Sequence, residues 1–300
     1  MSRSSSNSDK SSTKQSSRGG EIANLVESIG VDAKNYKGKK HGSEAQGEDA
    51  VVKSKLPIGW KIFYAIGIPV WAFFGFVLAQ AIARAFIEML LAFDVPLGAV
   101  NMTVLNTVAA VAIYSLAIFL VIAIPWFIKR KSTTKKELGL QRPPSWFDVA
   151  ITPIGAMAYI ALTVLVMSLA MNFLTFIDYS EAQDTGFSLM ASQTEYILAF
   201  LSLVIIAPIA EELLFRGYVL GKMLKYVPAW LAVVVSSALF AAAHGQWNVA
   251  LDTFALGVVL AVLRLVSKSV WPSIMLHMLK NGVAYYFLFI NPTFLSTLGG

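Results

Sequence analysis

Cysteine is absent from the 300-residue sequence. Its absence excludes disulfide bonds, thiolate metal ligands and a cysteine nucleophile, so any chemistry has to use other side chains. Charged residues are scarce as well, at 14% of the chain, whereas 56% of the residues are hydrophobic and the mean hydropathy is +0.64. This composition is too apolar for a soluble domain of this length and predicts a membrane protein.

Polar residues are concentrated at the N-terminus. Residues 1–55 are rich in Ser, Gly and Lys and cannot bury enough apolar surface to offset the entropy of an unfolded chain. We therefore expect a disordered, polar, cytoplasmic tail over this range. Residues 56–193 are predicted to hold the first transmembrane helices and a basic cytoplasmic loop, and residues 194–300 a second group of helices.

Seven apolar runs beyond Pro57 are each long enough to cross a bilayer as a helix, which takes about 20 residues. Only helices are expected, because lipid offers no hydrogen-bond partner for an unpaired backbone group. The sequence therefore predicts an all-α polytopic membrane bundle of about seven transmembrane helices. After the first run, Gln80, Arg84 and Glu88 recur every four residues, so that helix is expected to continue with one polar stripe. The approximate limits of the runs are 60–83, 102–128, 149–174, 196–220, 229–245, 249–266 and 271–290.

Basic residues next to the predicted spans are distributed unevenly. Fourteen of them precede the first span, follow the second, or lie at the ends of the fourth and sixth. The connections DVPLGAVN, TFIDYSEAQDTGFSLMASQ and QWN, and the tail after Ile290, contain none. Because basic loops stay in the cytoplasm, we expect a plasma-membrane protein with a cytoplasmic N-terminus and its C-terminus on the other side. The net charge of +6 then reflects topology, and no nucleic-acid partner is expected.

The stretch IIAPIAEELLFRGYVL, residues 205–220, places two carboxylates and an arginine inside an apolar run. An ionised group at mid-bilayer costs about 2.5 to 3.5 kcal/mol by insertion scales, so these side chains should face the interior of the bundle. Glu212 and Arg216 are four residues apart and are predicted to form a structural ion pair. Glu211 has no partner at a favourable spacing in its own helix. Pro208 is expected to kink the helix and to free the carbonyl of Val204.

Partners for Glu211 should therefore come from other spans. Of the three histidines, His41 lies in the tail, whereas His244 and His277 lie in membrane segments. Asn281 follows His277 by four residues and is expected on the same helical face. A lone membrane histidine is usually a packing or hydrogen-bonding residue, but two of them beside an unpaired glutamate favour a functional site.

Three short motifs carry a resemblance to a known family. EELLFR fits the pattern EExxxR, FAAAH at 240–244 fits FxxxH, and HMLKN at 277–281 fits HxxxN, in this order on three separate apolar segments. The ordered set resembles the CPBP family, the CAAX prenyl endopeptidases and bacteriocin-processing enzymes that are also called Abi proteins. The resemblance covers roughly residues 196–289, so residues 194–300 are expected to form the catalytic membrane core. The earlier KKELGLQRP is similar to a short cytoplasmic element often found upstream in the family.

The resemblance implies an intramembrane glutamic endopeptidase. Glu211 and His244 would activate a water molecule, His277 and Asn281 would stabilise the oxyanion, and the neighbouring ion pair would shape the site. No metal or other cofactor is expected. Zinc is the alternative, since one Glu and two His suit zinc, although no HExxH spacing presets two ligands on one helical turn.

Two functions outside proteolysis stay open. Intramembrane acids and histidines also serve proton relays in ion-coupled carriers, although we find no inverted repeat of the kind that such carriers favour. A non-catalytic membrane scaffold or immunity factor would keep the same fold. As an endopeptidase, the protein is expected to act on a membrane-associated peptide or protein through a cavity that opens to the cytoplasm. No residue chooses among a leader peptide, an anchored peptide end and a lipidated C-terminus.

Overall fold

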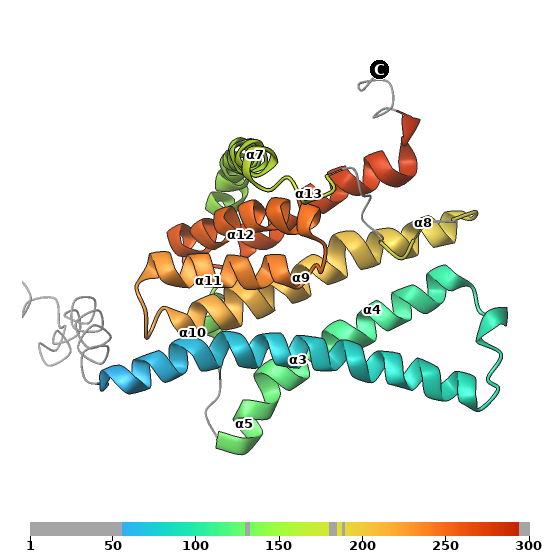
Figure 1. Ribbon diagram of the computed structural model, residues 1–300, viewed down its shortest axis with the longest axis horizontal. Helices are drawn as coiled ribbons and strands as arrows, with labels where there is room; N and C mark the ends of the chain where they lie inside the picture. Colours follow the sequence, from blue (N-terminus) through green and yellow to red (C-terminus); the bar gives the residue numbers. More distant parts are fainter. Residues whose placement is uncertain (1–55, 130–132, 180–184, 188–189, 294–300) are drawn as a thin grey trace, which may run out of the picture. The chain divides into compact units, whose positions relative to one another are not determined.

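A computed structural model describes residues 56–129, 133–179, 185–187 and 190–293, and every regular element among them is a helix (Figure 1). The described residues from Pro57 on form one compact unit. The all-α fold is therefore confirmed. The predicted tail, residues 1–55, lies outside the described residues, and so does His41 within it.

Helical runs follow each of the seven predicted apolar segments. Five of them are long and apolar enough to cross a membrane, and a sixth, α11, is apolar but has only 14 residues. Together they confirm a polytopic helical membrane bundle. The bounds are α3 Ile58–Ala92; η2 Leu97–Ala99; α4 Met102–Ile118, η3 Phe119–Ala123 and α5 Ile124–Lys129; α6 Lys135–Leu138; α7 Trp146–Phe173; α8 Gln193–Phe200, η4 Leu201–Ile206, α9 Ala207–Glu212, η5 Leu213–Leu220 and α10 Gly221–Met223; α11 Ala229–Ala242; α12 Trp247–Ser267; and α13 Trp271–Tyr285 with η6 Tyr286–Ile290.

Helix α3 continues well past its predicted limit at residue 83. It is a single helix of 35 residues, and Gln80, Arg84 and Glu88 all lie within it. The polar stripe is therefore helical, as expected. Asp94, two residues beyond the helix end, has a φ of 55°, a left-handed conformation that stops the helical path.

Side-chain caps fix where three of the helices begin. Asn101 accepts hydrogen bonds from the backbone N–H groups of Thr103 and Val104 at the start of α4. Ser145 opens α7 with a capping box, and Ser192 accepts from the N–H of Glu195 at the start of α8. Such oxygens satisfy backbone donors that the first helical turn leaves unpaired, which explains these starting points.

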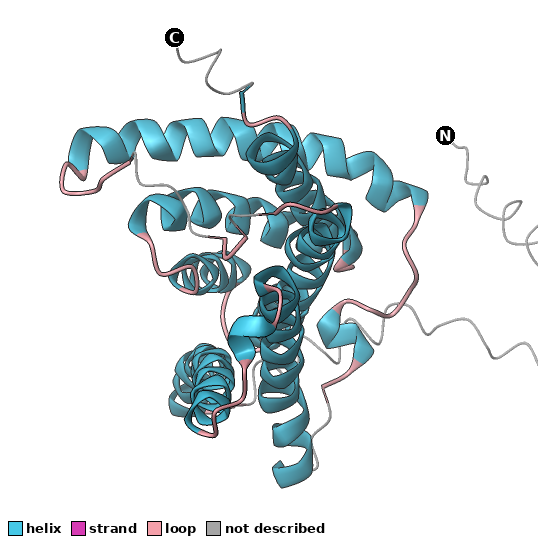
Figure 2. Ribbon diagram, turned by 90° about the vertical axis from the view of Figure 1, so that its right-hand side faces the viewer, coloured by secondary structure: helices cyan, strands magenta, loops and turns pink. Residues whose placement is uncertain are grey.

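Helices α11 and α12 form an antiparallel hairpin beside the long run from α8 to α10, and α3 packs against α4 (Figure 1). Helix α7 is seen nearly end-on in Figure 1 and along its length in Figure 2, so it crosses the other long helices steeply. It contacts α12 and α13. The hydrophobic core lies between α3, the α4–η3 run, the α8–α10 run, α11, α12 and α13. Its largest fully buried apolar side chains include Phe240, Leu220, Met223, Leu256, Leu260 and Leu276.

The short helix α6 forms in the segment KKELGLQRP and docks on the bundle. Thr134 and Glu137 make a capping box at its start, and Gly139, with a φ of 74°, ends it. Arg264 of α12 donates to two carbonyls of α6 at 3.2 Å each. Burial alone would raise the pKa of Glu137, but hydrogen bonds from Lys225 and from the backbone of Thr134 outweigh it and hold that pKa below its ordinary value. These contacts tie the basic loop to the bundle.

Candidate active site

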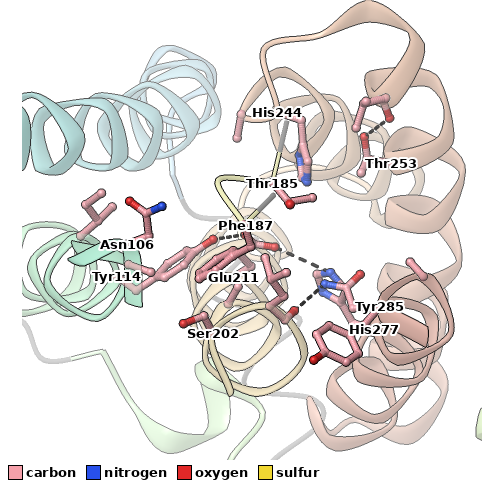
Figure 3. A pocket seen from close by; sticks show the side chains of 18 of the residues that line it. Asn106, Tyr114, Thr185, Phe187, Ser202, Glu211, His244, Thr253, His277 and Tyr285 are labelled. Carbon is pink, nitrogen blue, oxygen red and sulfur yellow. Dashed lines mark hydrogen bonds and ion pairs between the residues drawn. The ribbon is translucent and has the colours of Figure 1, made fainter. Parts of the chain in front are cut away.

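Polar side chains from several helices converge on one cavity of about 430 Å³ (Figure 3). Glu211 of α9, His277 and Asn281 of α13, and His244 from the α11–α12 turn all line it. These four are the residues for which the sequence predicts catalytic roles, and the fold brings them together. The fifth predicted helix ends at Ala242, three residues before its expected limit, so His244 lies in the turn.

Glu211 is buried, with 8% of its surface exposed. Its Oε1 accepts a hydrogen bond from the hydroxyl of Tyr114 on α4. Its Oε2 lies 3.7 Å from Nε2 of His277, which is too long for a direct hydrogen bond. One carboxylate oxygen is thus held in place, while the other faces the cavity and a histidine ring.

Glu212 lies on a different side of the same helix and is fully buried. It accepts a hydrogen bond from Nη1 of Arg216 at 2.9 Å, which is the ion pair predicted from their spacing. The same oxygen, Oε1, also lies 3.0 Å from Nδ1 of His277. Because a carboxylate only accepts, Nδ1 carries the proton, and the ion pair fixes the orientation of the His277 ring.

His244 is oriented by the backbone of α11, the helix that precedes it. Its Nδ1 lies 2.9 Å from the carbonyl oxygen of Phe240. A carbonyl only accepts, so Nδ1 carries the proton and neutral His244 has a free lone pair on Nε2. In Figure 3 its ring points into the space that Glu211 and His277 also face. Among the described residues, neither Glu211 nor His277 lies within ion-pair or hydrogen-bond distance of His244.

Phe240, the aromatic residue of the FxxxH motif, packs against three members of this group. Its ring centroid lies 5.0 Å from that of His244 and 5.5 Å from that of His277, both edge-to-face. The guanidinium carbon of Arg216 lies 4.2 Å from the same centroid. The fully buried ring therefore restricts both imidazoles, and the guanidinium of Arg216 over its face is stabilised.

Asn281 is anchored to the opposite wall by its amide. Its Nδ2 donates to the carbonyl oxygen of Leu203 at 2.9 Å. The sequence predicts that Pro208 frees the carbonyl of Val204, four residues earlier, but η4 before it is a π-helix. In a π-helix the backbone N–H of a residue pairs with the carbonyl five residues earlier. Pro208 has no N–H, so the carbonyl of Leu203 lacks its backbone donor. The amide of Asn281 supplies a donor instead.

A double-mutant cycle tests this pairing. Asn281→Ala should lower the free energy of unfolding by about 1 to 3 kcal/mol, because a buried carbonyl loses its donor. Pro208→Ala restores a backbone N–H, so the same Asn281→Ala change should cost clearly less in that background. Thermal unfolding of the four proteins in one detergent measures the coupling. Strictly additive effects would show that the amide does not serve the carbonyl freed by the proline.

Tyr114 is a site residue that the sequence did not indicate. It lies in the apolar run AAVAIYSLAIF, where tyrosine is an ordinary membrane residue, and it belongs to none of the three motifs. Its hydroxyl contacts Glu211 only because α4 packs against α9. The site therefore draws on helices from the region 56–193 as well as on the predicted catalytic core.

A second polar group borders the cavity. Asp252 of α12 accepts hydrogen bonds from Tyr159 at 2.7 Å and Thr163 at 3.1 Å, both on α7. The amino group of Lys280 lies 3.5 Å from its other oxygen, and Lys280 lines the cavity.

No three His, Asp or Glu side chains among the described residues are grouped closely enough to hold a metal ion. The imidazole groups have other partners on one nitrogen each, the carbonyl of Phe240 for His244 and the carboxylate of Glu212 for His277. The arrangement suits hydrogen-bond and proton-transfer chemistry at the cavity surface.

Comparisons with known proteins agree with the motifs. The family model described as "Type II CAAX prenyl endopeptidase Rce1-like" matches residues 193–283, a range that contains all four predicted catalytic residues. The "Membrane-embedded CAAX protease MroQ" of Staphylococcus aureus is 26% identical over 194 residues, which cover 61% of this chain and 76% of that protein. No solved structure matches.

Two further relatives have names that state no activity. "UPF0177 protein YxdF" of Lactococcus lactis is 33% identical over 130 residues, covering 43% of this chain and 67% of that protein. An "Uncharacterized 24.3 kDa protein" of Escherichia coli is 36% identical over 89 residues, which cover 28% of this chain and 41% of that protein. With the ordered motifs, the helical membrane fold and the converging side chains, these matches show that the chain belongs to the CPBP family of CAAX-type intramembrane endopeptidases.

Proposed function

We propose that the protein hydrolyses peptide bonds of a membrane-associated peptide or protein with a water molecule activated by Glu211 and His244. The observation that carries this proposal is the convergence of Glu211, His244 and His277, from three separate helical segments, on one cavity inside an apolar bundle. Burying such groups is costly, and a site that uses them explains why they are there.

Water activation follows from the free positions on two side chains. Tyr114 occupies Oε1 of Glu211, so Oε2 is the oxygen that can accept a proton from water. The unprotonated Nε2 of His244 offers a second acceptor that faces the same space. As the water oxygen attacks the carbonyl carbon of the peptide, its proton would pass to the glutamate and later to the leaving amine nitrogen.

The oxyanion of the tetrahedral intermediate would be stabilised by His277 and Asn281. Glu212 holds Nδ1 of His277 and aims Nε2 toward the cavity, where a protonated ring can donate. Asn281 uses one amide hydrogen for the carbonyl of Leu203 and keeps a second one for the oxyanion. Removing one oxyanion donor typically costs about 2.7 to 4 kcal/mol of transition-state stabilisation.

A quenched-fluorescence peptide in liposomes tests the reaction and its substrate class. The reconstituted protein should cleave a peptide that carries a prenyl group near a CAAX-type C-terminus, the substrate chemistry named for the matching family. The same peptide without the prenyl group serves as the matched control for a lipid requirement. Equal fluorescence from the native protein and from Glu211→Gln on both peptides would contradict the proposal.

We further propose that no metal takes part. Hydrolysis of the fluorescent peptide should then survive exhaustive treatment of the protein with a strong chelator. Metal analysis should find well under one zinc per chain. His277→Ala should lower the rate without changing metal content. Activity that disappears with the chelator and returns with added zinc would overturn the glutamic mechanism in favour of a zinc site.

The bias of basic residues supports an orientation in the plasma membrane with the N-terminus and the loop around α6 in the cytoplasm. The partners that this function requires are the lipid bilayer and the peptide substrate. Reporter fusions after Lys136 and after Leu298 would report opposite compartments in this orientation.

A further inference from the structure

Lys280 brings a positive charge to the wall of the cavity that holds Glu211. Among the described residues that line this cavity, Lys280 is the only lysine or arginine. Its side chain is 23% exposed and is therefore partly accessible. An ammonium group inside an apolar membrane bundle is costly, and the reaction proposed above gives this one no role.

The amino group of Lys280 is held by a carboxylate that is itself fixed. Oδ1 of Asp252 accepts hydrogen bonds from Tyr159 at 2.7 Å and Thr163 at 3.1 Å, so Oδ2 faces the lysine. The 3.5 Å from Oδ2 to Nζ is longer than an ordinary hydrogen bond of about 2.7 to 3.2 Å. In the described part of the chain, the amino group has no other polar contact. Because an ammonium group has three N–H donors, at least two are free for a ligand.

Lys280 lies close to the residues proposed for the reaction. It follows His277 by three residues on α13 and directly precedes Asn281, and all three line the cavity. Its position is roughly 4.5 Å from that of His277 along the helix axis, at 1.5 Å per residue. An extended peptide advances about 3.3 Å per residue, so a group bound at Lys280 would lie within a few residues of the peptide bond that is cleaved.

A carboxylate is the group of an unmodified peptide that suits this position best. Hydrogen bonds between an ammonium group and a carboxylate are about twice as strong as those between neutral groups. Asp252 shares its charge with two hydroxyl donors and lies at a long distance, so it neutralises Lys280 incompletely. Among the described residues, the cavity lining includes Lys280 but not Asp252, so the pair presents its cation there.

We propose that Lys280 is a specificity-determining residue whose ammonium group binds a carboxylate of the substrate, either its C-terminus or an acidic side chain. Asp252 is then a positioning residue that, with Tyr159 and Thr163, directs the amino group to the cavity wall. The proposal rests on the proposed function, because it requires that a peptide enters the cavity.

Binding of four dye-labelled prenylated peptides tests the proposal. Fluorescence anisotropy is measured with the full-length protein carrying Glu211→Gln, so that no peptide is cleaved. The first peptide has a free C-terminus and no acidic side chain, and the second is its C-terminal amide. The third and fourth are amides that end in glutamate and in glutamine. The first pair reports a preference for a C-terminal carboxylate, and the second pair a preference for an acidic side chain.

In at least one pair, the carboxylate peptide should bind about 10- to 100-fold more tightly, the usual contribution of a hydrogen bond to a charged group. Lys280→Met should bring this ratio close to one, and Lys280→Arg should keep most of it because the charge is retained. Lys135→Met, the same change on an exposed residue of α6, should leave the ratio unaltered. If Lys280→Met alone destabilises the protein, Lys280→Met with Asp252→Asn leaves no unpaired charge and should give the same ratio.

The proposal is overturned if neither carboxylate peptide is preferred, which includes the result that no peptide binds. It is also overturned if a preference persists unchanged in the Lys280→Met protein. Binding needs no hydrolysis, so the two proposals fail separately. A preference that depends on Lys280, in a protein whose native form cleaves none of the peptides, would contradict the proposed reaction and support the carboxylate site.

Discussion

Replacing Glu211 with glutamine is expected to lower peptide hydrolysis by about 10²- to 10⁴-fold, the usual contribution of a general base. Glutamine keeps the shape of the side chain and an oxygen for the hydroxyl of Tyr114, but it cannot take a proton from water. Both KM and the amount of protein in the membrane should change little. The rate on the fluorescent peptide and the thermal unfolding temperature measure the two effects.

An exposed glutamate, Glu88, provides a matched control for this substitution. Glu88→Gln makes the same chemical change on an exposed residue near the end of α3, and it should leave both rate and stability unaltered. A Glu211→Gln protein with native turnover would remove this residue from the reaction. If the variant instead failed to accumulate, its carboxylate would have a structural role.

Replacing Glu212 with glutamine is expected to cost about 3 to 5 kcal/mol of stability, because the buried guanidinium of Arg216 loses its counter-charge. The structure adds a second consequence. His277 donates to the same oxygen, so the variant should also lose activity through a misoriented ring. The sequence predicted that the pair of Glu212 and Arg216 shapes the site, and the contact with His277 gives a physical route by which it would do so.

A double replacement separates these two roles. Glu212→Leu with Arg216→Met removes the whole buried ion pair and leaves apolar groups of similar size, a change that is often neutral for stability. The double variant should regain most of the lost unfolding temperature while its turnover stays low, because His277 still lacks an acceptor for Nδ1. Recovery of turnover together with stability would argue against a positioning role for Glu212.

Local features of the site could be predicted from sequence because helical geometry fixes them. The pair of Glu212 and Arg216 follows from a spacing of four residues, and so does the shared face of His277 and Asn281. The helical runs follow from hydropathy, since lipid permits little else. These features need no knowledge of how the helices pack.

Contacts between helices could not be read in this way. The bond from His277 to Glu212, and that from Tyr114 to Glu211, depend on the rotation of each helix about its axis. The hydrogen bond from Asn281 to the carbonyl of Leu203 depends on a π-helical register that no residue pattern predicted. The place of His244 in a turn depends on the short α11, whose end lies three residues before its predicted limit.

The most direct measurement is a comparison of membrane peptides from cells that produce the native chain with those from cells that produce Glu211→Gln at the same level. Mass spectrometry of labelled peptide termini would be the readout. The account predicts new termini in membrane-associated proteins or peptides that appear only with the native chain. Identical sets of termini in the two samples would contradict it.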